Sequence, residues 1–238
     1  MNILDTLFPK TCSICKRKGT YLCDRCEKLF KRTLPECYIC RRLSSHYKTH
    51  SHCKETKKSS YLDNVFIAWE YNSLTSDLLK KYKYGYVYDM ADIMSEFFVK
   101  NIVNSNLTNS FSKTLLTNVP IPDNRLRERG FNQTLKISEA ISKYFDIPFS
   151  ENLLRRKNTY DHQSLKDRGE RKYVSKEDFI VKSSSNVSAY KSITIVDDVM
   201  TTGITLESVS ERLKETFGKE LVINGICMFR GRAYYLKK

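Results

Sequence analysis

The stretch from Ile193 to Thr205 places two acidic residues, four threonines and one glycine close together. A β-branched run leads into Asp197 and Asp198 and predicts a buried strand. A short loop of hydroxyls and glycine follows, and from Thr205 onward the apolar spacing predicts a helix. Backbone amides and the dipole at a helix N-terminus favour an anion, and glycine lets it approach closely. Adjacent carboxylates suit ribose hydroxyls or a magnesium ion, so the stretch predicts a sugar-phosphate site. We assign ribose and phosphate binding to Val199, Met200, Thr201, Thr202, Gly203, Ile204 and Thr205, and any catalytic role to Asp197 and Asp198.

This order of residues resembles the ribose-phosphate loop of the type I phosphoribosyltransferases. It excludes a Walker-type nucleotide loop, because no Gly-Lys-Ser or Gly-Lys-Thr follows the strand. A dinucleotide fingerprint is excluded as well, because the stretch contains a single glycine. The alternative is an ordinary strand-to-helix turn with a polar cap.

A second stretch, Val119 to Gln133, also follows a strand and precedes a helix. The loop within it is expected to carry Arg125, Arg127 and Arg129 and to end at a glycine. Open α/β sheets bind ligands beyond the carboxyl ends of their strands, so both stretches should meet at one crevice. The guanidinium groups would then contact pyrophosphate or DNA. The alternative is that these arginines are only solvated.

Seven of the eight cysteines lie in the first quarter of the chain. Repeated Cys-x-x-Cys pairs predict zinc sites, and structural sites have four protein ligands. The first predicted site is Cys12, Cys15, Cys23 and Cys26, and the second begins with Cys37, Cys40 and Cys53. Thr56 occupies the position expected for the last cysteine. Either His50 or His52 supplies the fourth ligand, or the second site has lost its metal.

The formal net charge is +14, from 41 Lys and Arg against 27 Asp and Glu. Such an excess favours a polyanionic partner, with single-stranded nucleic acid first and an anionic membrane surface second. A basic solvated surface is the alternative. Residues 1–9 are too short and polar for a secretory signal, and no apolar run approaches the roughly 20 residues of a membrane helix. We therefore expect a cytoplasmic protein without membrane insertion.

The remaining chain alternates between strand and helix patterns. Strands are expected at 65–69, 114–121, 193–196 and 221–229, and helices at 75–84, 89–103, 131–144 and 205–217. This alternation predicts an α/β fold, a mostly parallel sheet with helices on both faces. We place a cysteine-rich domain at 1–57, a polar linker around 54–60, and the α/β domain at 61–238. A basic segment, 155–172, is expected to form a flexible flap.

Together these parts resemble the ComF family of competence proteins over nearly the whole chain. The resemblance rests on the double zinc ribbon, Pro-Ile-Pro…Arg-Glu-Arg-Gly-Phe-Asn-Gln, Gln163-Ser164-Leu165 with Arg168 and Arg171, and the Asp-Asp loop. It implies a type I phosphoribosyltransferase fold and a role in natural transformation, where members help bring single-stranded DNA into the cytoplasm. It also implies partners: a ComFA-type DNA-translocating ATPase, which would bring the protein to the inner face of the membrane, and recombination mediators. Thr56 departs from the family's ligand pattern.

Three functions are compatible with these features. The first is a competence factor that binds single-stranded DNA and keeps a phosphoribosyl pyrophosphate pocket. The second is an active phosphoribosyltransferase that uses phosphoribosyl pyrophosphate and magnesium in nucleotide salvage or modification. The third is an adaptor whose loop is a relic. No residue identifies an acceptor base, and the charge favours the first function.

Overall fold

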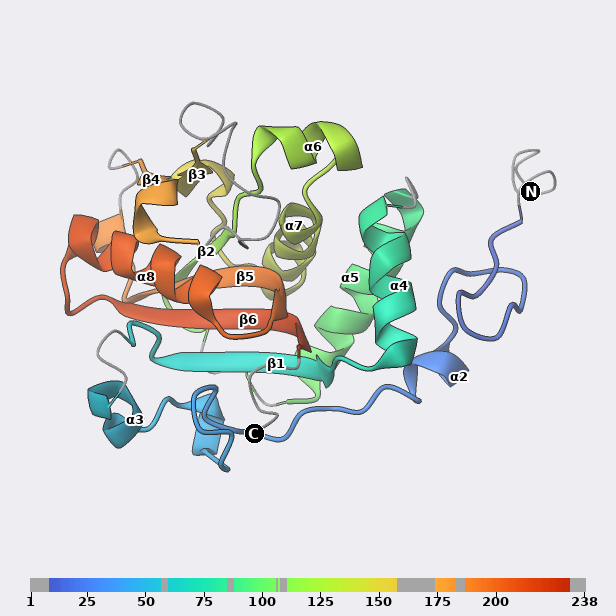
Figure 1. Cartoon of the computed structure of the whole chain (residues 1–238), viewed down its shortest axis with the longest axis horizontal. Coiled ribbons are helices and arrows are strands. Elements are labelled where there is room, and N and C mark those ends of the chain that lie inside the picture. The colour runs from blue at the N-terminus through green and yellow to red at the C-terminus, as the bar shows by residue number, and fades with distance from the viewer. Residues whose placement is uncertain are drawn as a thin grey trace, which may run out of the picture.

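A computed structural model places most of the chain (Figure 1). The described residues are 9–56, 60–84, 88–105, 107, 111–157, 174–182 and 187–231. The Gln163-Ser164-Leu165 triplet, Arg168 and Arg171 lie outside them. Among the described residues, no helix is both long enough and apolar enough to cross a membrane.

The centre of the fold is a four-stranded parallel sheet with the order β1-β6-β5-β2. The strands are β1 (Asn64–Glu70), β2 (Thr114–Asn118), β5 (Ser192–Met200) and β6 (Val222–Arg230). All four are buried along most of their length, as strands of a sheet covered on both faces must be. The predicted α/β class and parallel sheet are therefore confirmed.

Helices cover both faces of the sheet (Figure 1). One face carries α4 (Ser73–Tyr84), α5 (Tyr88–Val103) and α7 (Gln133–Phe145), and the other carries α8 (Ile204–Phe217). Strand residues alternate between the two cores because successive side chains of a strand point to opposite faces. In β1, for example, Phe66 and Ala68 join the first core, whereas Val65 and Ile67 join the second.

The chain reverses its direction across the sheet between β2 and β5. After β2, α7 leads outward to Phe149, which bridges Leu116 in parallel beyond that edge. The amide of Ser150 donates to the Leu116 carbonyl at 2.9 Å. After β5, α8 leads the opposite way, to β6. Right-handed connections running in opposite directions put their helices on opposite faces and open a crevice at the switch.

Part of the expected flap is instead a hairpin of β3 (Leu154–Arg156) and β4 (Phe179–Val181). Phe179 is fully buried in the core beside α8, which holds the hairpin on that face. The flap prediction is therefore wrong at Arg155 and Arg156, which pair with β4 because Phe179 is buried beside α8; residues 158–172 lie outside the described part of the chain. The short helical turns nearby are η3 (Glu151–Leu153), η4 (Lys176–Asp178) and η5 (Val187–Ala189).

The cysteine-rich head contains α2 (Asp24–Glu27), η1 (Ser45–Tyr47) and α3 (Ser51–Thr56). It runs along the free edge of β1 (Figure 1). The amide of Glu70 donates to the Lys31 carbonyl at 2.8 Å, and the amide of Thr33 donates to the Ala68 carbonyl at 3.0 Å. Phe30 packs edge-on against Trp69 at 5.8 Å between ring centroids.

The start of the expected linker is not a linker. Residues 54–56 form the end of α3, and Lys54 makes a 2.5 Å ion pair with Asp63, just before β1. Residues 57–59 lie outside the described part of the chain. The boundary between domains at 1–57 and 61–238 stays a prediction.

Candidate functional site

The acid pair lies inside β5 rather than after it. Hydrogen-bonded register with β6 continues through Asp197 to Met200, four residues beyond the predicted strand end. Both carboxylates are half-buried. Because neighbouring strand residues face opposite ways, Asp198 points towards the face covered by α4 and Asp197 towards the face of the β3–β4 hairpin.

Each acid lies near a cation that the sequence analysis did not select. Lys83 of α4 forms a 2.6 Å ion pair with Asp198, and both side chains are largely buried. Burial raises the pKa of Asp197 to about 7, and the negative charge of Asp198 adds to this rise. The amide of Asp198, at 2.8 Å, and the charges of Lys83 and Arg156 oppose the rise in this pKa. Asp197 is therefore a carboxyl group that titrates near neutral pH.

The loop after β5 is short, and α8 begins at Ile204, one residue before the predicted start. Gly203 caps the helix in the left-handed region, with φ +84°. A Cβ there would lie 2.7 Å from Met200 Cε and 3.4 Å from the Tyr38 ring. Thr201, Thr202 and Ile204 are exposed and Thr205 is half-exposed, whereas Val199 is half-buried and Met200 is buried. The helix N-terminus and its hydroxyls thus remain open to an anion.

The predicted arginine loop is a helix, α6 (Asp123–Arg129), which ends at Gly130 with φ +77°. Arg125 and Arg127 are exposed, but Arg129 is buried and donates to Gln133 Oε1 at 3.1 Å. The prediction that this segment is a loop is wrong: the amide of Leu126 donates to the Pro122 carbonyl at 3.0 Å and the amide of Gly130 donates to the Leu126 carbonyl at 2.8 Å, as in a helix. Arg129 therefore has a structural partner, and Arg125 and Arg127 are the open cations.

Arg156 of β3 connects α6 to the acid pair. Its pKa is lowered mainly by burial, with the positive charge of Arg125 lowering it further and the negative charges of Asp178 and Asp197 raising it. Its guanidinium lies 5.3 Å from the Phe179 ring centroid. The acid pair, Lys83 of α4, Arg156 of β3 and Arg125 of α6 therefore interact with one another at the carboxyl end of β5, beside the switch between β2 and β5.

Two groups of ligand atoms in the head fit structural metal sites. The first is Cys12, Cys15, Cys23 and Cys26, and the second is Cys37, Cys40, His50 and Cys53. Within each group, the ligand atoms lie within 4.8 Å of one another. Four sulfur or nitrogen donors with no open position are the ligand set of structural zinc. Both groups would hold zinc, and neither leaves a place for a catalytic water.

The structure selects His50 as the fourth ligand of the second group. Its Nδ1 lies 3.3 Å from Cys40 Sγ. His52 is exposed, one residue into α3. The Thr56 hydroxyl donates to the His52 carbonyl at 2.9 Å and so serves the helix rather than a metal.

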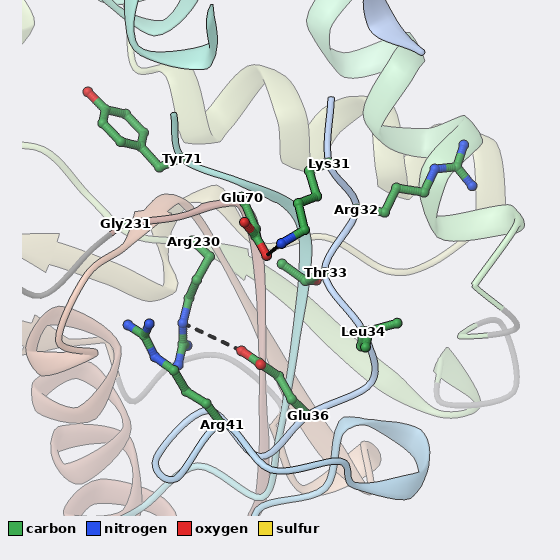
Figure 2. A pocket seen from close by; sticks show the side chains of 10 residues that line it. All are labelled: Lys31, Arg32, Thr33, Leu34, Glu36, Arg41, Glu70, Tyr71, Arg230 and Gly231. Atoms are coloured by element: carbon green, nitrogen blue, oxygen red, sulfur yellow. Dashed lines mark ion pairs between the residues drawn. The ribbon is translucent and has the colours of Figure 1, made fainter. Parts of the chain in front are cut away.

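A charged hollow of about 260 Å³ lies between the head and the carboxyl ends of β1 and β6 (Figure 2). Ion pairs join Lys31 to Glu70 at 2.8 Å and Arg230 to Glu36 at 3.6 Å. The other lining residues are Arg32, Thr33, Leu34, Arg41, Tyr71 and Gly231. A Cβ on Gly231 would lie 2.5 Å from Thr201 Cγ2, so the hollow adjoins the loop between β5 and α8, residues 201–203, which is the predicted phosphate loop. Sequence analysis missed this hollow, whose only local signal is the basic character of the head.

Comparison with known proteins gives three curated relatives and no matching family model. Competence protein F of Haemophilus influenzae is 27% identical over 209 residues, which cover 86% of this chain and 89% of the relative. Competence protein ComFC of Bacillus subtilis is 26% identical, covering 88% of this chain and 84% of the relative. Competence protein ComFC of Streptococcus pneumoniae is 26% identical, covering 84% of each.

Proposed function

We propose that the chain is a member of the ComF family of competence proteins and that it acts in natural transformation on incoming single-stranded DNA. We further propose that it binds phosphoribosyl pyrophosphate, or a closely related sugar phosphate, at the switch between β2 and β5. A ComFA-type ATPase and recombination mediators are its expected partners, and the cytoplasm is its expected location. The observation that carries the pocket is an acid pair and an open hydroxyl loop that meet at one crevice.

The crevice has a group for each part of such a ligand. Asp197 and Asp198 would accept from the ribose hydroxyls and hold magnesium, which supplies charge neutralisation of the pyrophosphate. The start of α8, with its threonines and Gly203, would bind the 5′-phosphate. Arg125 and Arg127 would contact the pyrophosphate, since Arg129 is already bound to Gln133.

The electrostatics of Asp197 support a ligand there. A half-buried carboxyl with a pKa of about 7 contributes less to stability as an ion than an uncharged side chain would. Perturbed carboxyls of this kind are concentrated at functional sites, where a cation or ligand hydroxyls compensate the charge. Neither Asp197 nor Asp198 is required to pair the strands, because that pairing uses backbone groups alone.

The exposed basic side chains of the head support the DNA proposal. Arg32 and Arg41 line the charged hollow, and their charges are not matched there, since its two acids pair with Lys31 and Arg230. The hollow adjoins Thr201, so a strand that follows it would reach the phosphate loop. Cationic side chains along a groove bind a single strand mainly through its phosphates.

Calorimetric titration of the zinc-loaded protein with phosphoribosyl pyrophosphate and magnesium tests the pocket. We expect binding by the wild type and none by Asp197→Asn/Asp198→Asn of unchanged fold. Equal binding by the variant would show that the pocket lies elsewhere.

A double variant of the head tests DNA binding. Arg32→Ala/Arg41→Asn should weaken single-strand binding. It should also reduce the slope of log affinity against log salt concentration by the contribution of about two phosphate contacts. Lys191→Ala/Lys219→Ala, just before the amino ends of β5 and β6, should do neither; equal losses in both double variants would refute the assignment to the hollow.

An active transferase is the second candidate, and the near-neutral pKa of Asp197 favours it. A group that titrates near the working pH is suited to proton transfer. Pyrophosphate release from phosphoribosyl pyrophosphate in the presence of a nucleobase or single-stranded DNA would identify this activity. Binding without release would support the first candidate alone.

A further inference from the structure

The second metal group contacts the phosphate loop directly through Tyr38. This residue follows Cys37 within the Cys37-x-x-Cys40 turn and is 4% exposed. Its hydroxyl donates to a carboxylate oxygen of Glu207 in the first turn of α8. Its ring faces Gly203, the residue that caps this helix. The amide of Tyr61 also donates to Glu207, at 2.8 Å.

Arg230 makes the second connection, from the end of β6. Its Nη2 donates to the Tyr38 carbonyl at 2.6 Å, and its Nη1 donates to Met200 Sδ at 3.5 Å. Its Nε faces Glu36, the residue before Cys37, on the wall of the charged hollow (Figure 2). The arginine is 7% exposed, so these contacts are shielded from water.

These contacts reach the loop and both of its flanks: Met200 at the end of β5, Gly203 in the loop, and Glu207 in the first turn of α8. The first metal group has a different surrounding. Its Cys12 and Cys26 pack in the core that contains α4, α5 and Trp69. Both groups therefore have the ligands of a structural zinc site, four cysteines in the first and three cysteines with a histidine in the second, but they pack against different parts of the fold.

We propose that metal in the second group holds Tyr38 in place and thereby keeps the phosphate loop in its anion-binding geometry. Tyr38 is a positioning residue, since it contacts the loop and helix but not the open anion site. Linkage is reciprocal, so an anion on the loop must in turn tighten retention of the second zinc. The ligand part of this proposal rests on the proposed sugar-phosphate pocket, whereas the loop part does not.

Hydrogen exchange tests the loop part without any ligand. Cys40→Ser removes one ligand of the second group, and Cys15→Ser is the matched control in the first; metal analysis should find two zinc ions in the wild type and one in each variant. We expect exchange of amides 201–207 to accelerate at least about tenfold in Cys40→Ser and to stay unchanged in Cys15→Ser. Unchanged exchange in Cys40→Ser, or equal acceleration in both, would overturn the proposal.

Tyr38 variants separate the ring from the hydroxyl. Tyr38→Ala should retain two zinc ions yet show the same fast exchange at 201–207, and Tyr38→Phe should restore most of the protection because its ring still covers Gly203. Protection in Tyr38→Ala equal to the wild type would refute a positioning role.

The reciprocal effect is measured by zinc release to a chelator with and without phosphoribosyl pyrophosphate. We expect the ligand to slow release of the second zinc at least about fivefold in the wild type and not in Tyr38→Ala. Slowing that is equal in both proteins would refute the linkage. A wild type that binds no phosphoribosyl pyrophosphate would refute the proposed pocket, while the exchange result would still decide the loop part.

Discussion

Asp197 is expected to bind the proposed ligand but to lower the free energy of unfolding at neutral pH. Its pKa of about 7 lies well above the ordinary value of 3.8, because the charged form is desolvated and lies beside Asp198. Asp197→Asn removes this charge and keeps an oxygen that can accept from the amide of residue 198, as Asp197 does at 2.8 Å. The variant should therefore be more stable than the wild type at neutral pH, although it loses the proposed ligand.

The magnitude follows from the difference in pKa between the folded and unfolded states. Well below pH 4 the carboxyl is protonated in both the folded and the unfolded state, so it does not contribute to the pH dependence of the unfolding free energy. Between pH 4 and 7 only the unfolded state ionises, so the wild type loses stability as the pH rises. The expected gain in Asp197→Asn is about 2 kcal/mol at pH 5.5 and up to about 4 kcal/mol at pH 8, at about 1.4 kcal/mol per pKa unit.

Urea unfolding of both zinc-loaded proteins at pH 5.5 and pH 8 measures this gain. Asp198→Asn is the matched control: it relieves the same repulsion but loses the 2.6 Å ion pair with Lys83. It should therefore gain less than Asp197→Asn at pH 8, by about 1–3 kcal/mol. The reasoning is refuted if Asp197→Asn is no more stable than the wild type at pH 8, or if its gain does not grow between the two pH values.

Two further pairs of substitutions, each a test with its control, examine the loop and the arginines. Gly203→Ala forces a Cβ into a left-handed position and against Met200, which should cost about 1–3 kcal/mol in urea unfolding and abolish sugar-phosphate binding by calorimetry. Gly218→Ala, also at positive φ but with no atom near its Cβ, should lose stability and keep binding; binding retained by Gly203→Ala would contradict this account. Arg129→Ala should cost about 1–3 kcal/mol because it leaves Gln133 buried without its partner, whereas Arg127→Ala should change stability by less than about 0.5 kcal/mol and weaken anion binding. The reverse order of stabilities would show that Arg129 is the open cation.

Features that depend on short-range pattern could be predicted from the sequence. The first metal group is an example, because each Cys-x-x-Cys turn brings its own two sulfurs together. The predicted bounds of most of these strands and helices lie within two residues of those of the structure, since each has a continuous apolar face, although β5 extends four residues further and β2 ends three residues earlier. The residue order around Asp197 to Thr205 likewise predicted a strand, a short turn and a helix start, because these are consecutive in the chain; anion binding by this loop stays a prediction.

Features that depend on contacts between distant segments required the tertiary structure. Packing of α3 decided that His50, not His52, completes the second metal group. Burial of Arg129 and its hydrogen bond to Gln133 make it a structural residue, whereas two unselected cations, Lys83 and Arg156, were brought to the acid pair. Each of these outcomes depends on which side of an element faces the core, and on which remote charge then lies opposite. The sequence by itself therefore determined the chemistry available at the metal groups and the phosphate loop. Only the tertiary structure decided which cations lie beside the acid pair and which side chains contact the metal groups and the loop, because burial and ion pairing join residues far apart in the chain.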